Sequence, residues 1–172
     1  MTSDDRLNFQ RGLTGHKLNA PYLVLYNSSA KDANATVVKR EDIDFEFIVE
    51  SKAYWFATNN LTEAYYVVAI LNSALPNLLM KDFQSKGLFG PRDVHKKILD
   101  VYFPKFNEHN EKHLQLAALS EAAHRKTSLF LKENPPQQPL TAMFLGRLRL
   151  EIKKDLMIEL TEINSIVNEL IK

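Results

Sequence analysis

Two long stretches with helical periodicity fill the second half of the chain, and a proline-rich segment separates them. The first runs from about Glu111 to Lys132 and is rich in leucine and alanine, and the second runs from about Thr141 to Lys172. Residues 133–139 between them contain three prolines, which lack a backbone N–H and clash with a continuing helix. We therefore expect an antiparallel helical hairpin over residues 107–172, and treat it as the second of two domains.

The second of these stretches carries one apolar stripe along its length. Large apolar side chains recur at steps of three and four residues, which is the spacing of a coiled-coil seam. They are Leu145, Leu148, Ile152, Leu156, Leu160, Ile163, Val167 and Leu170. The hairpin carries nine basic and nine acidic residues, so we expect its outer face to be solvated rather than to bind phosphate.

Residues 1–106 predict an α+β domain with a small mixed sheet and packed helices. Short segments bounded by turn residues combine β-branched and aromatic side chains, which is typical of strands. These segments are residues 21–26, 36–38, 45–49, 53–57 and 98–103. In 45–49 the prediction depends on the alternation of Phe45, Phe47 and Val49 with other residues.

Two helices are expected between the last two of these strands. Asn60 can cap the first helix, and Glu63 can complete a capping box three residues later. The apolar residues that follow recur at helical spacing and predict one buried face: Leu61, Tyr65, Val68, Leu71 and Leu75. Pro76 fits the first turn of a second helix that extends to about Phe83.

The composition excludes several classes of protein. The chain has no cysteine, which excludes disulfides, thiolate zinc sites and a cysteine nucleophile. No apolar run approaches the length of a membrane span. The first residues are polar and acidic, unlike a signal peptide, and we expect a cytoplasmic protein. Since the formal net charge is only +1, any affinity for nucleic acid must come from a local patch.

A basic loop at residues 81–97 is the strongest candidate for such a patch. Five basic residues stand there against Asp82 and Asp93. With His95 added, the candidate DNA-binding residues are Lys81, Lys86, Arg92, His95, Lys96 and Lys97. Lys and Arg suit phosphate contacts, while Arg and His can also address base edges. Gly87 and Gly90 permit close approach of the backbone to a partner.

Two patterns support other interpretations less well. Asp42 or Asp44 with Glu50 and Lys52 loosely resembles the pattern of magnesium-dependent nucleases, although the carboxylate spacing is short. A small nuclease of this kind therefore stays open as an alternative, as does a purely structural assembly module that uses the apolar stripe. Asn134-Pro135-Pro136 is followed by Gln137, so it lacks the aromatic residue of an adenine methyltransferase motif and is better explained as a turn.

Three histidines also share a helical spacing. His109, His113 and His124 lie 4 and 11 residues apart, close to whole helical turns. A metal site is conceivable on that spacing, but solvated histidines at the mouth of the hairpin explain it better, because no further carboxylate or histidine cluster supports them. We therefore assign no metal and no catalytic residue to this chain.

Three stretches carry a resemblance to a known family. Residues 63–73 (EAYYVVAILNS), 86–95 (KGLFGPRDVH) and 101–106 (VYFPKF) resemble the C-terminal specificity region of adenine-N6 DNA methyltransferases. These are type IIG and related restriction–modification enzymes, with the TaqI-like specificity domain and type I specificity subunits as more distant kin. The Gly-Leu-Phe-Gly-x-Arg-Asp-x-His stretch is the most specific part, and the tail at 162–170 is also similar.

The resemblance covers roughly residues 20–172 and implies recognition of a target sequence in double-stranded DNA. It implies a methyltransferase domain or subunit as partner, which would bind S-adenosylmethionine and supply the catalysis. The chain itself carries neither a glycine-rich cofactor loop nor a complete Asn-Pro-Pro-aromatic motif. We therefore expect a non-catalytic recognition module without a cofactor of its own.

The first prediction follows from those missing motifs. The chain should neither bind S-adenosylmethionine nor methylate DNA, because no backbone loop is suited to cradle the cofactor and Gln137 cannot stack on a flipped adenine. Titration calorimetry with the cofactor should give no heat of binding. Saturable binding in the micromolar range would contradict the prediction.

Overall fold

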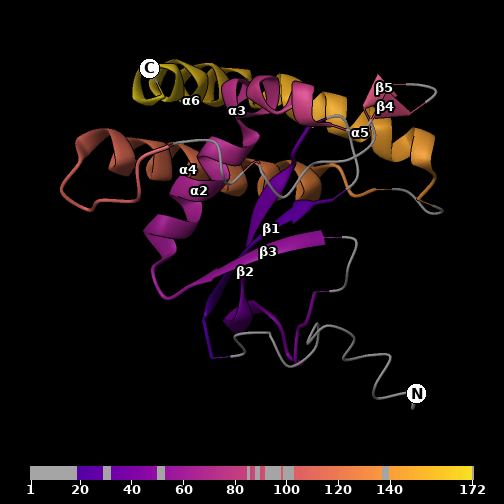
Figure 1. The fold of residues 1–172 in the computed structure, drawn as a ribbon. Coiled ribbons are helices and arrows are strands. Elements are labelled where there is room, and N and C mark those ends of the chain that lie inside the picture. The colour runs from indigo at the N-terminus through magenta and orange to yellow at the C-terminus, as the bar shows by residue number, and fades with distance from the viewer. Residues whose placement is uncertain are drawn as a thin grey trace, which may run out of the picture.

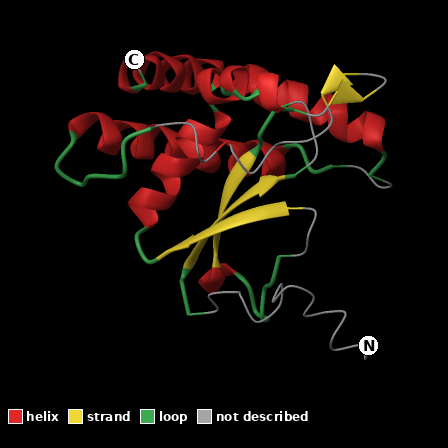
Figure 2. Ribbon diagram, viewed as in Figure 1, coloured by secondary structure: helices red, strands yellow, loops and turns green. Residues whose placement is uncertain are grey.

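The computed structural model describes residues 19–28, 32–49, 53–84, 86–87, 90–91, 98, 103–136 and 140–171. They form an α+β fold in which helices lie on one side of a small sheet (Figure 1, Figure 2). In chain order the elements are β1 (Tyr22–Asn27), β2 (Ala35–Lys39), η2 (Arg40–Asp42), β3 (Ala53–Thr58), α2 (Leu61–Asn72), α3 (Ala74–Leu79), η3 (Lys81–Phe83), β4 (Lys86–Gly87), β5 (Gly90–Pro91), α4 (Glu111–Glu133), α5 (Ala142–Asp155) and α6 (Met157–Leu170).

The three-stranded sheet has β1 at its centre and is antiparallel rather than mixed. Its order is β2-β1-β3, and Val24 lies opposite Val37 in β2 and Phe56 in β3. Because side chains alternate between the two faces of a strand, Val24 and Tyr26 share one face, and both belong to the main buried cluster. Leu23, on the opposite face, is also fully buried.

Three predicted strands are confirmed, at 21–26, 36–38 and 53–57, and the one at 45–49 is wrong. That segment is irregular, and Phe45 is 73% exposed. The Arg40 guanidinium donates to the carbonyl of Phe47 at 2.9 Å, so a side chain takes an acceptor that a neighbouring strand would need. The alternation of residue types there does not correspond to two faces of a sheet.

The predicted strand at 98–103 lies largely outside the described residues. Of its two described ends, Ile98 is 1% exposed and belongs to the main cluster, and Phe103 packs against that cluster without regular secondary structure. The carbonyl of Pro104, the next residue, accepts a hydrogen bond from the Tyr66 hydroxyl at 2.6 Å. The segment is therefore tied to α2 through a side chain.

Helix α2 is buried on all sides. Every residue from Ala64 to Leu71 is at most 7% exposed, so burial extends beyond the single face predicted from apolar spacing. The helix contacts all three strands of the sheet as well as α3, α4 and α6. A helix without a polar face requires cover from every direction, which explains why the other elements gather round it.

Asn60 caps α2 as predicted. Its side-chain oxygen accepts from the N–H groups of Thr62 and Glu63 at 2.9 and 3.1 Å. In a complete capping box the Glu63 carboxylate would accept the Asn60 N–H directly. Here the Asn60 N–H donates to the Thr58 hydroxyl at 3.1 Å, and that hydroxyl donates to the Glu63 carboxylate. Thr58 thus stands between the two residues expected to bond directly.

Two asparagines connect the end of α2 and the helix that follows to β2 and to the loop before it. Asn72 pairs with the main chain of Ala35, accepting its N–H at 2.7 Å and donating to its carbonyl at 2.9 Å. Asn77 in α3 accepts the N–H of Ala33 at 2.7 Å. Pro76 lies in the first turn of α3, as predicted, although the helix begins at Ala74.

Helices α4 and α6 pack antiparallel, which confirms the hairpin for this pair. Near one end the Lys112 ammonium lies 2.7 Å from the Glu169 carboxylate, and near the other the Lys126 ammonium lies 3.3 Å from Glu159. The apolar side chains between the two helices are buried at Leu116, Ile163 and Val167. All three belong to the cluster that also contains α2 and the sheet, so the hairpin packs against the domain before it.

The long second helix is interrupted at Leu156, which separates α5 from α6. Leu156 has a ψ angle of 10°, away from the helical value, although its N–H still bonds to the Ile152 carbonyl at 2.9 Å. The predicted stripe is buried at Ile163 and Val167 in α6, whereas α5 has no buried residue. None of the described helices has the length and apolar character of a membrane span.

The second prediction separates the two faces of α6. Replacing Ile163 by alanine should lower the free energy of unfolding by about 2–5 kcal/mol, because the side chain is 2% exposed and its removal leaves a cavity. The matched change Ile158→Ala, at a residue that is 76% exposed, should alter it by less than about 0.5 kcal/mol. Urea denaturation of both variants measures the difference, and equal destabilisation would contradict the packing.

Candidate functional site

The structure describes part of the predicted DNA-binding loop. Lys81 begins η3 and its side chain is exposed, as is that of Asp82 beside it. Lys86 lies in β4, paired with Pro91 of β5. The other predicted DNA-binding residues lie outside the described part of the chain: Arg92, His95, Lys96 and Lys97.

Strands β4 and β5 form a short two-stranded antiparallel ribbon. Gly87 lies opposite Gly90 next to the Lys86–Pro91 pair. The ribbon is a separate sheet, and Figure 1 draws it apart from the three-stranded one. Since glycine has no side chain, this paired segment can come close to another backbone. The two glycines singled out in the sequence thus face one another across the ribbon.

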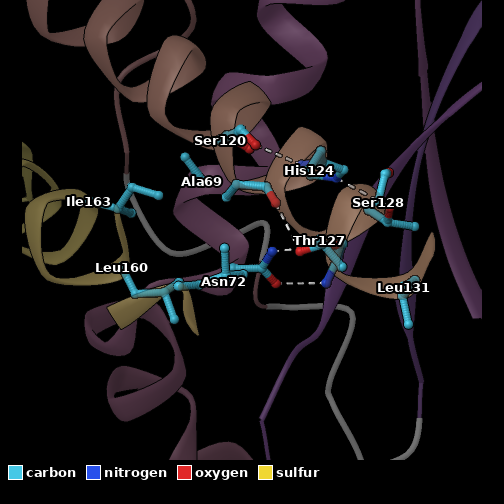
Figure 3. Close-up of a pocket in the computed structure, with 13 residues that line it drawn as sticks. Ala69, Asn72, Ser120, His124, Thr127, Ser128, Leu131, Leu160 and Ile163 are labelled. Carbon is cyan, nitrogen blue, oxygen red and sulfur yellow. Dashed lines mark hydrogen bonds between the residues drawn. The ribbon is translucent and has the colours of Figure 1, made fainter. Parts of the chain in front are cut away.

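A cavity of about 390 Å³ lies between β2, α2, α4 and the α5–α6 junction. Figure 3 shows Asn72, His124 and Thr127 on one side of it and Leu160 and Ile163 on the other. The described lining residues include no Asp, Glu, Lys or Arg. A cavity with these walls offers hydroxyl, amide and imidazole groups opposite an apolar wall, and no charge for a phosphate.

His124 connects α4 to the edge strand β2 across this cavity. Its Nδ1 lies 2.7 Å from the Ser120 carbonyl oxygen, so that nitrogen carries the proton. Its Nε2 then accepts the N–H of Val37 at 3.3 Å and lies 3.2 Å from the Thr36 hydroxyl. Burial lowers the pKa of His124, partly offset by the hydrogen bond to Ser120 and by Glu121. The imidazole therefore acts as a neutral bridge between helix and sheet.

The polar groups of the cavity are largely used within the fold. Both ends of the Asn72 amide bond to Ala35, and the Thr127 hydroxyl donates to the Ala123 carbonyl at 2.8 Å. His124 has no carboxylate behind it, because its Nδ1 proton goes to a backbone carbonyl. The other ring nitrogen, Nε2, faces the Val37 N–H and the Thr36 hydroxyl, so both nitrogens of His124 join α4 to β2.

A second imidazole lies in an aromatic cluster where α2, residues 103–107 and α4 meet. The His113 ring lies 4.6 Å from the Tyr66 ring and 6.3 Å from the Phe106 ring, centroid to centroid. Its Nδ1 accepts the N–H of Asn107 at 3.0 Å, while its Nε2 has no hydrogen-bond partner among the described residues. Burial lowers the pKa of His113 and raises that of Tyr66 to about 12.

The expectation of solvated histidines is wrong for two of the three. His113 is 2% exposed and His124 is half-buried, whereas His109 is exposed. Their helical spacing reflects the contacts of α4 with α2 and with β2, because His113 stacks on Tyr66 and His124 meets the Tyr65 ring at 5.2 Å. Within the described ranges, no group of three His, Cys, Asp or Glu side chains could hold a metal ion.

The residues of the alternative nuclease are only partly described. Asp42 ends the 3₁₀ helix η2, and both it and Asp44 are exposed. Glu50 and Lys52 lie outside the described residues. Asn134 follows α4, where its N–H and side-chain amide donate to the Phe130 carbonyl at 2.8 and 3.0 Å. That position is consistent with a helix end rather than a cofactor motif.

Comparisons with known proteins add no relative. No protein-family model matches the chain, and neither the curated proteins nor the solved structures contain a significant match.

Sequence reasoning missed the His124 bridge to β2, the burial of His113 against Tyr66 and the Asn72 pairing with β2. Each depends on contacts between residues far apart in the chain, such as His124 with Val37 and Asn72 with Ala35. A usable signal was present at Asn72, because a polar residue that directly follows a fully apolar helical run must find a partner.

The third prediction concerns pH. The folded-state pKa values of His113 and His124 are lowered from 6.5, so the unfolded chain binds more protons in acid. The corresponding stability is fully present above pH 6.5 and is lost as the pH falls from there toward the folded-state pKa values. Urea denaturation from pH 8 to 5 should show this decline.

His124→Gln removes one of the two titrating groups and should flatten that decline. His109→Gln changes an exposed histidine and should leave the slope as in the wild type. A wild-type stability independent of pH between 5 and 6.5 would contradict the assignment of both imidazoles as neutral in the fold.

Proposed function

We propose that this chain is a DNA target-recognition module that serves an adenine-N6 methyltransferase of a restriction–modification system. The single observation that carries the proposal is the β4–β5 ribbon, because it lies within the basic stretch that the sequence singled out. A two-stranded β-ribbon is one of the two elements that fit the major groove of B-DNA.

The charge distribution supports placing DNA at this ribbon. Residues 81–97 hold five basic and two acidic side chains, whereas the whole chain has a net charge of only +1. Phosphate contacts from such a segment position a protein on DNA, and a few side chains that reach base edges supply sequence preference. The facing glycines of the ribbon would let its backbone approach the phosphates.

The scaffold supports a binding role more than a catalytic one. Hydrogen bonds within the fold occupy the imidazole and amide groups around the central cavity, and no charged residue is among its described lining. Loops carried on a packed core are common binding elements. Methylation would then be supplied by a separate methyltransferase domain or subunit that binds S-adenosylmethionine.

The fourth prediction tests the loop directly. Replacing Lys86, Arg92, Lys96 and Lys97 together by alanine should weaken binding to duplex DNA and flatten its salt dependence. The slope of log affinity against log salt should fall by about one unit for each phosphate that the variant no longer neutralises. Fluorescence anisotropy with labelled duplexes over a salt series measures both quantities.

A matched control changes one arginine and three lysines elsewhere. The exposed residues Arg125, Lys132, Lys153 and Lys154 lie in α4 and α5, and their replacement by alanine should leave the salt slope nearly unchanged. Equal weakening in the two quadruple variants would show a diffuse charge effect and contradict the site. Absence of any DNA binding by the wild type would contradict the proposed function itself.

Base reading is distinguished from phosphate contact by a conservative change. Arg92→Lys keeps the charge but loses the planar fork that addresses guanine. If Arg92 reads a base, this variant should keep the salt slope and lose about 1–3 kcal/mol of discrimination at one position of the target. Unchanged preference across a randomised duplex pool would assign Arg92 to the phosphates.

A further inference from the structure

Helix α5 leaves an apolar face uncovered. None of its 14 residues is buried, and Met143 and Leu150 are 67% and 62% exposed. Met157, the first residue of α6, is 65% exposed. A helix of this length is marginally stable in water without packing. Its exposed side chains are therefore well placed to gain stability from a partner.

The exposed residues follow a regular order. Along α5 and the start of α6, steps of four, three, four and three residues join Met143, Arg147, Leu150, Lys154 and Met157. At 100° per residue the four that lie in α5 fall within roughly 60° of the helix circumference, and Met157 follows just past the interruption at Leu156. We call this line the α5 seam. It alternates apolar and cationic side chains and lies opposite the half-buried face that contains Leu148 and Ile152.

The cations of the α5 seam have no acidic partner in the described part of the chain. Neither Arg147 nor Lys154 forms an ion pair there, although Lys112 and Lys126 on α4 both do. Arg147 instead directs a guanidinium nitrogen to the Met143 sulfur, 3.8 Å away, along the seam itself. Two unpaired cations therefore alternate with exposed apolar side chains.

Gly146 adds an independent observation beside the seam. It lies in the middle of α5, and a Cβ atom there would meet nothing within 4 Å. Glycine inside a helix costs stability relative to alanine, and no contact within the described part of this chain requires it. A glycine at this place does, however, let another helix approach α5 closely.

We propose that the α5 seam is a docking surface for an acidic amphipathic helix of a partner protein. Apolar side chains of that helix pack against Met143, Leu150 and Met157, while its carboxylates pair with Arg147 and Lys154. The steps of three and four residues are those of helix-to-helix packing, and charges within such a seam fix the register and choice of partner.

Other occupants fit the seam less well. A second copy of this chain would set Arg147 against Lys154 or against itself, which is repulsive in either orientation. A lipid surface favours a broad apolar face with the cations at its margins, whereas here they interrupt a narrow line. A DNA backbone would satisfy the two cations but would leave three exposed apolar side chains against phosphates.

The test uses the full chain and a designed helical peptide as the probe. The peptide is about 21 residues long, or roughly six helical turns, labelled and blocked at both ends, with leucines facing the apolar seam residues and glutamates facing Arg147 and Lys154. A second peptide carries lysine in place of each of those glutamates. Wild-type protein should bind the acidic peptide saturably and the lysine peptide at least about tenfold more weakly, because like charges across an interface are repulsive.

Charge reversal supplies the decisive comparison. The double variant Arg147→Glu/Lys154→Glu should lose binding to the acidic peptide and gain binding to the lysine peptide. The matched variant Arg125→Glu/Lys132→Glu reverses one arginine and one lysine exposed on α4, and should behave as the wild type. Leu150→Ser should weaken binding of the acidic peptide without unfolding the chain, which circular dichroism checks.

Several outcomes would overturn the proposal. One is that the wild type does not bind the acidic peptide saturably. Another is that the two double variants change peptide binding equally. If sedimentation shows that the wild type self-associates and Arg147→Glu/Lys154→Glu does not, the α5 seam binds a second copy of the chain instead. The wild type is also tested with vesicles of phosphatidylserine and phosphatidylcholine and with duplex DNA. If Arg147→Glu/Lys154→Glu abolishes either of these interactions and leaves peptide binding unaffected, the α5 seam binds that partner instead.

Discussion

The burial of every residue from Ala64 to Leu71 in α2 is the constraint on which the rest of this structure depends. A helix with no polar face cannot meet water on any side, so the sheet, α4, α6 and the residue 103–106 segment must together enclose it. Tyr66 lies in the middle of this helix, and its hydroxyl donates a hydrogen bond to the Pro104 carbonyl of that segment. Elements from both halves of the chain therefore belong to one cluster.

Polar side chains around this enclosure hold separate elements together. Asn72 and Asn77 bond to the main chain of Ala35 and Ala33, and His124 bonds to both α4 and β2. Buried polar groups are costly unless they are paired, and each of these pairs joins two separate elements. These hydrogen bonds fix how the elements are placed relative to one another, which apolar contacts alone would do less specifically.

Candidate binding surfaces lie at the periphery, and charge distinguishes them. The basic stretch around the β4–β5 ribbon combines cations with facing glycines, which suits a phosphate backbone. The α5 seam alternates cations with exposed apolar side chains, which suits a protein helix. Both kinds of surface would serve the recognition module proposed above, one for nucleic acid and one for protein.

The sequence by itself determined the local features whose causes lie within a few residues. The Asn60 cap, the three confirmed strands, the extent of α4 and the place of Pro76 in a first turn all follow from nearby residues. Tertiary structure decided whatever depends on distant partners. The 45–49 segment is irregular and its Phe47 carbonyl bonds to the Arg40 side chain, while the burial of His113 and the half-burial of His124 depend on what α4 packs against. Periodicity reports which face of an element is apolar, but only packing decides how much of that face is covered, as the contrast between α6 and α5 shows.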